Sequence, residues 1–74
     1  MFALLGEARV TGRGERIWLY RWMCSDPRIM TTNELDENEI RMIADTLAYW
    51  QREGELESRS RVAIDEAKAK WRDA

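Results

Sequence analysis

Aromatic and arginine side chains gather in one short stretch, and they are the residues of this chain best suited to binding chemistry. Trp18, Tyr20 and Trp22 occupy alternate positions and have several arginines nearby. Tryptophan, tyrosine and arginine are enriched at the centres of protein interfaces, and arginine supplies multidentate hydrogen bonds there. The predicted partner-binding residues are therefore Trp18, Tyr20, Trp22, Arg9, Arg16 and Arg21.

Three interpretations of these aromatics compete. They form the core of a small fold, a contact surface for another protein or a second copy, or a platform on which single-stranded nucleic acid stacks. A net charge of −2 argues against binding to phosphates. We therefore expect another protein as the partner, with a homodimer as the expected assembly. Nucleic-acid binding through the same segment or the C-terminal helix is the alternative.

The residue inventory leaves little room for catalysis or transition-metal chemistry. The chain has no histidine and one cysteine, Cys24. Catalytic triads that use histidine are therefore impossible, and a zinc site, which draws its four ligands mainly from cysteine and histidine, cannot form in the usual way. We expect no enzymatic activity, no cofactor and no metal.

Two local patterns resemble ligand sites but have simpler explanations. Gly12 and Gly14 lack the third glycine of a dinucleotide-binding motif, since position 17 is isoleucine. The acidic run from Glu34 to Glu39 lacks the glycine of a calcium loop and is typical of a helix N-terminus, where acids are favoured. We interpret the first as a turn and the second as helix capping.

The element expected to carry the aromatics is an N-terminal β-hairpin over 2–23. Two runs of alternating character flank Thr11-Gly12-Arg13-Gly14, and glycines permit the positive φ angles of tight hairpin turns. In a strand, side chains at alternate positions share a face. This places Trp18, Tyr20 and Trp22 together on one side of the ribbon.

A linker over 24–35 and two helices over 36–53 and 56–72 complete the expected fold. Thr31 with Glu34 and Asp36 with Glu39 are competing capping boxes, and the second is favoured because helical spacing of apolar residues begins at Ile40. Gly54 separates the helices, with one continuous helix as the alternative. The predicted fold class is α+β, a ββαα arrangement with the hairpin packed on a helical hairpin.

The 74 residues are expected to form a single domain over 1–74 in the cytoplasm, because a lone cysteine suits a reducing compartment and no apolar run is long enough for a membrane span or a signal peptide. The expected function is that of a small, regulatory, non-enzymatic protein-binding module. It would be an adaptor, or an inhibitor of a larger protein of the kind that mobile elements encode. Whether the aromatic face is core or interface stays open.

Overall fold

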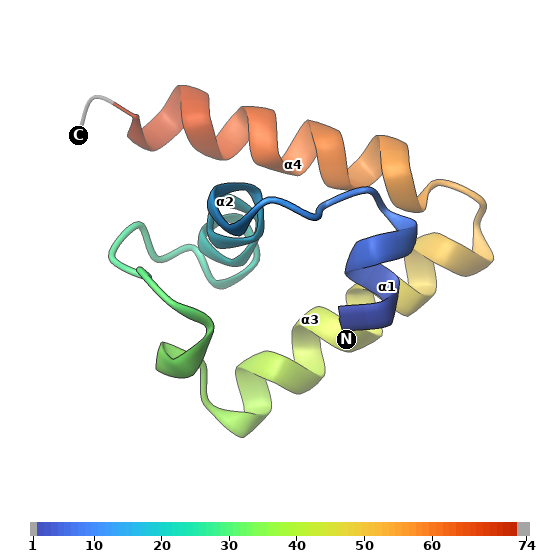
Figure 1. The fold of residues 1–74 in the computed structure, drawn as a ribbon, viewed down its shortest axis with the longest axis horizontal. Coiled ribbons are helices and arrows are strands. Elements are labelled where there is room, and N and C mark those ends of the chain that lie inside the picture. Colours follow the sequence, from blue (N-terminus) through green and yellow to red (C-terminus); the bar gives the residue numbers. More distant parts are fainter. Residues whose placement is uncertain (1, 73–74) are drawn as a thin grey trace.

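The computed structural model describes residues 2–72 and is all-α (Figure 1). Its helices are α1 (Phe2–Glu7), α2 (Arg13–Cys24), α3 (Glu37–Arg52) and α4 (Leu56–Trp71), with a 3₁₀ turn, η1 (Thr32–Glu34), before α3. No strand occurs among the described residues. The α+β prediction, with its ββαα arrangement, is therefore wrong.

The N-terminal hairpin predicted over 2–23 is instead the helix pair α1 and α2. The run from Ile17 to Met23 is apolar at nearly every position, so it fits a strand and a buried helix equally well. The helix forms with Glu15 in its first turn and Arg21 in its last, which suits the helix dipole at both ends. Gly12, expected in a hairpin turn, is the extended residue just before α2.

Three of the helices end with the same backbone motif, in which one left-handed residue reverses the chain. These residues are Arg9 after α1, Ser25 after α2 and Gly54 after α3. At each end, the N–H of the next residue bonds the carbonyl five positions back, as in Val10 to Leu5 at 2.9 Å. Only Gly54 is a glycine, so only this left-handed position could be recognised in the sequence by its residue type.

The two C-terminal helices lie close to their expected positions. Asp36 caps α3, because its carboxylate accepts the N–H of Glu39 at 2.7 Å while the Glu39 carboxylate accepts the N–H of Asp36 at 3.0 Å. Gly54, with φ of 72°, separates α3 from α4, so the chain does not form one continuous helix. Glu34 closes over the preceding loop, where its carboxylate accepts the N–H of Thr31 at 2.8 Å.

The main interhelical packing joins α2 to α4, which cross one another (Figure 1). The buried face of α4 is rich in small side chains, including Ser60, Ala63 and Ala67. Small side chains let two helices approach closely, so Leu19 of α2 is completely buried. The helices α1 and α3 also pack together, and the side chain of Gln51 donates a hydrogen bond to Glu7.

A glycine substitution distinguishes the helix from the hairpin. Gly14 lies in α2 without a positive φ, and a Cβ added there meets nothing within 4 Å. Gly14→Ala should therefore raise the free energy of unfolding by about 0.5–1 kcal/mol in urea titrations, because alanine loses less backbone entropy on folding. Gly54→Ala is the control and should destabilise by about 1 kcal/mol. Destabilisation by Gly14→Ala would contradict a helical α2.

Candidate functional site

The helical period distributes the predicted binding residues of α2 over more than one face. Residues two apart in a helix differ in direction by about 200°, whereas residues four apart nearly coincide. Trp18 and Tyr20, expected side by side on a strand, therefore point to different sides of α2. The shared aromatic face predicted from strand alternation does not exist, and each member has to be located separately.

Tyr20 and Arg16 lie on the face of α2 that looks toward η1 and the N-terminal segment. Tyr20 has no exposed surface, and its hydroxyl accepts a hydrogen bond from Thr32 Oγ1 at 3.4 Å. Arg16 is partly buried; its Nη2 donates to the Thr11 carbonyl at 3.2 Å, and its guanidinium lies 5.8 Å from the Phe2 ring centroid. Tyr20 therefore belongs to the core rather than to a contact surface.

Trp22 lies on a second face of α2, where it contacts α4 and α3. Its indole Nε1–H donates to the Glu66 carboxylate at 2.9 Å, and its ring centroid is 6.1 Å from that of buried Trp50. On the same face, Glu15 accepts a hydrogen bond from Arg61 of α4 at 3.2 Å. These contacts bracket Leu19, so Trp22 serves mainly to join helices.

Trp18 lies one turn before Trp22 and packs partly against the core, and Arg21 lies next to it on the side of the loop after α2. Trp18 is partly exposed, and the Arg21 guanidinium stands 4.6 Å from its ring centroid. Arg21 also donates to the Ile29 carbonyl at 2.8 Å and to Met30 Sδ at 3.2 Å. Arg21 therefore holds the loop after α2 beside the tryptophan.

An open groove of about 300 Å³ lies between α2 and the loop that follows it, and its walls are mostly apolar. Met30 forms one wall with 64% of its surface exposed, and Glu34 accepts a hydrogen bond from its backbone N–H. The other walls come from the outer face of α2. The residues lining this feature, the Trp18 groove, are Gly14, Ile17, Trp18, Arg21 and Met30.

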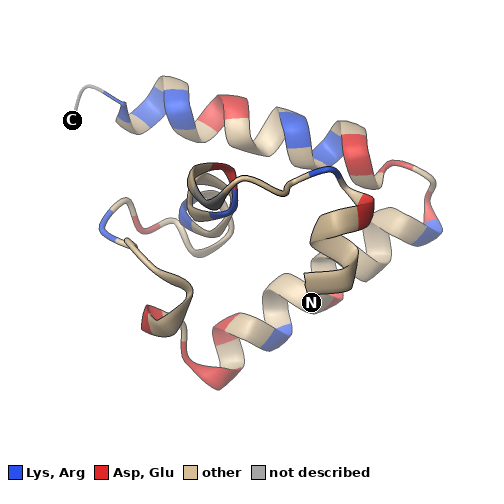
Figure 2. Ribbon diagram, in the orientation of Figure 1, with Lys and Arg blue, Asp and Glu red and all other residues tan. Residues whose placement is uncertain are grey.

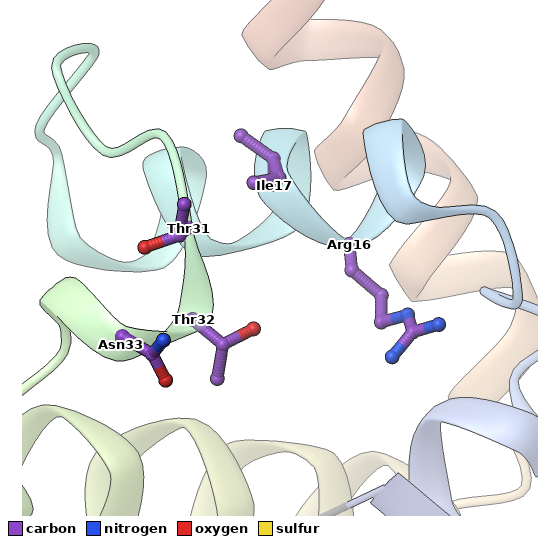
Figure 3. Close-up of a pocket in the computed structure, with 5 residues that line it drawn as sticks. All are labelled: Arg16, Ile17, Thr31, Thr32 and Asn33. Atoms are coloured by element: carbon purple, nitrogen blue, oxygen red, sulfur yellow. The ribbon is translucent and has the colours of Figure 1, made fainter.

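A second opening, of about 280 Å³, adjoins the groove and is lined by polar groups. Arg16 enters it from α2, and Thr32 borders it from the opposite side (Figure 3). Ile17 lines both openings and separates them. The lining residues of this Arg16 cavity are Arg16, Ile17, Thr31, Thr32 and Asn33.

The structure therefore brings only part of the predicted site together. Arg9 stands apart at the end of α1, exposed and 3.7 Å from Glu57 in a surface ion pair. Trp18 and Arg21 remain together, and Arg16 lies nearby in the second opening. Met30 and Thr32 were missed, because only the folding of the loop by Glu34 and Arg21 brings them beside α2.

Cys24, at the end of α2, is shielded from reaction by its surroundings. Burial first, then a hydrogen bond to Glu39 and the negative charges of Glu39, Asp26 and Asp36, raise the pKa of the Cys24 thiol to about 11. Since the thiolate is the reactive form, the protonated side chain is a poor nucleophile at neutral pH. The free thiol therefore behaves as a structural residue.

Charge on the helices follows no single sign. Figure 2 shows acidic and basic residues interspersed along α4, and acidic residues at the start of α3. A groove reader of DNA presents a continuous basic face, which α4 lacks. Among residues 2–72, no group of three or more His, Cys, Asp or Glu side chains is placed to hold a metal ion. Within the same residues, no helix is both long and apolar enough to cross a membrane.

The Trp18 groove and the Arg16 cavity thus share Ile17 and combine apolar with cationic surface, and Arg16 also lines a further opening with Phe2 and Thr11. Both depend on α2 and on the loop that η1 closes. The chain matches no protein-family model, no curated protein and no solved structure.

Proposed function

We propose that this protein is a non-catalytic module that binds another protein through the Trp18 groove. The observation that carries the proposal is that the Trp18 ring and the Met30 thioether line one open groove. Met30 is 64% exposed. Tryptophan is frequent at interface centres, and methionine adapts its shape to a partner. Arg21 keeps both walls in position.

The proposal keeps the expected role of an adaptor or inhibitor and changes its surface. An interface of standard size covers about 800 Å² on each partner. The whole described chain exposes 4921 Å², so such an interface would take up a large share of it. A reducing, cytoplasmic setting is part of the proposal and is supported by the single cysteine of the chain, which has no second cysteine to pair with.

The experiment compares capture of partners by two single variants. Trp18→Ala removes the centre of the groove, whereas Tyr49→Ala removes an equally aromatic side chain that is 54% exposed on α3. Proteins captured from native lysate by the wild type should be lost with Trp18→Ala and kept with Tyr49→Ala, as quantified by mass spectrometry. For an isolated partner, we expect Trp18→Ala to cost about 2 kcal/mol, or roughly 30-fold in Kd.

Light scattering over a range of protein concentrations provides the complementary measurement. A second copy bound through the groove would appear as a dimer that Trp18→Ala dissociates. Equal capture by Trp18→Ala and the wild type, with both monomeric, would rule out the groove as the binding surface.

A further inference from the structure

We propose that the partner presents an acidic side chain next to an apolar one, so that its carboxylate enters the Arg16 cavity while its apolar neighbour lies in the Trp18 groove. This inference rests on the proposed function and specifies the chemistry of the partner. It follows from the donors that line the cavity, from the lack of a carboxylate partner for Arg16, and from the wall that the two openings share.

The lining of the Arg16 cavity is rich in donors and contains no carboxylate. A guanidinium, two hydroxyls and a side-chain amide come from Arg16, Thr31, Thr32 and Asn33. The guanidinium can only donate, the Thr32 hydroxyl already donates to Tyr20, and the Thr31 hydroxyl and the Asn33 amide can donate as well as accept. A ligand with oxygen acceptors and a negative charge therefore complements this lining.

Among the described residues, Arg16 and Arg21 lack the carboxylate partner that four other arginines have. Arg9, Arg28, Arg59 and Arg61 each lie within 4.0 Å of a carboxylate, at Glu57, Asp26, Glu55 and Glu15 respectively. Among the described residues, Arg16 has no carboxylate partner, and its hydrogen bond goes to a backbone carbonyl. Its Nε–H is hidden from solvent and has no acceptor there. The positive charge of the guanidinium is thus left without a carboxylate, whereas the hidden Nε–H is out of the reach of a ligand.

The size and charge of the cavity favour a single carboxylate. At about 280 Å³ the cavity lies at the lower end of the usual range for small-molecule sites, so a small group such as a carboxylate fits it. Arg16 supplies one positive charge, which a carboxylate balances and a phosphate dianion exceeds. A phosphorylated side chain is therefore the weaker match.

The shared wall connects this carboxylate with the proposed interface. Ile17 lines the cavity on one side and the groove on the other. A carboxylate bound at Arg16 would therefore place the adjoining part of the partner over Ile17, with Trp18 and Met30 beyond it. Charge would select the partner, and apolar burial would supply most of the affinity.

Selection from a displayed peptide library tests the inference on the intact protein. The selected peptides should carry Asp or Glu beside an apolar residue. They are then synthesised with an amidated C-terminus, so that the side-chain carboxylate is the one tested. Replacing that acid by its amide should weaken binding about tenfold or more, and replacing it by phosphoserine should also weaken it. Arg16→Gln should remove the preference for acids and retain the apolar one. The control is Arg28→Gln. Arg28 lines neither opening, and its side chain is 89% exposed.

NMR of the arginine Nε–H groups gives the direct readout. The acidic peptide should shift the Arg16 Nε–H signal together with the Trp18 indole signal, and the amide peptide should shift only the indole. Selected peptides without an acid, or an acid preference that persists in Arg16→Gln, would overturn the inference and leave the proposed function standing. Failure to select any peptide that Trp18→Ala weakens would overturn both.

Discussion

Tyr20→Ala should largely unfold the protein, whereas Trp18→Ala should leave it folded. Tyr20 has no exposed surface and lies among the largest fully buried side chains, so its truncation leaves a cavity. Removal of a buried aromatic ring costs about 3–5 kcal/mol, which is comparable to the entire stability of many domains of this size. Trp18 is only partly buried, and we expect Trp18→Ala to cost about 1 kcal/mol.

Urea titrations followed by far-UV circular dichroism measure both effects. Tyr20→Phe is the matched control, since it keeps the ring and loses only the hydroxyl that accepts from Thr32 at 3.4 Å. It should cost about 0.5–1.5 kcal/mol. An equal decrease in the free energy of unfolding for Tyr20→Ala and Trp18→Ala would contradict the assignment of Tyr20 to the core and of Trp18 to the groove.

Ala63→Leu should also destabilise the protein severely, by enlarging a side chain instead of removing one. Ala63 is 1% exposed on the face of α4 that also carries Ser60 and Ala67. Three additional carbon atoms there would force the packed helices apart or distort their side chains. Overpacking of this kind costs about 1–3 kcal/mol, and a crossing of two helices with small residues offers little room for adjustment.

Ala69→Leu makes the same chemical change on the exposed side of α4. Its effect should stay within about 0.5 kcal/mol of the wild type, because nothing is packed against that position closely. Thermal unfolding of the two variants under identical conditions separates packing from helix propensity. A similar melting temperature for both would show that the small residues of α4 do not set its distance from its neighbours.

The C-terminal half could be predicted because its signals are local. Asp36 and Glu39 bond one another's backbone across a single turn, and Gly54 supplies the left-handed residue that ends a helix. Each of these features depends on residues at most a few positions apart. Such features can be recognised in the sequence without knowledge of the tertiary structure.

The N-terminal half could not be predicted in the same way. Helix α2 contacts α4 on one face and the core around Tyr20 on another, so apolar residues occur on several sides and the helical period is obscured. The left-handed positions that end α1 and α2 are Arg9 and Ser25, neither of which marks a turn as glycine does.

The candidate site was predicted in part for related reasons. The sequence placed Trp18 and Arg21 in one aromatic and basic segment, and in the structure the Arg21 guanidinium lies 4.6 Å from the centroid of the partly buried Trp18 ring. The other walls come from Met30 and Thr32, which are distant in the chain from Trp18. Their approach depends on contacts of Arg21 and Glu34 that no sequence period encodes.

The pairing of α2 with α4 has a consequence for the order in which the chain folds. Trp22 and Glu66 are 44 positions apart, and Arg61 and Glu15 are 46 apart, with α3 between the two helices. Neighbouring helices can pair early, but the principal contact forms only after this long loop has closed and its entropy has been lost. We therefore expect the rate at which the chain folds to be governed by a search between distant segments rather than by helix formation itself.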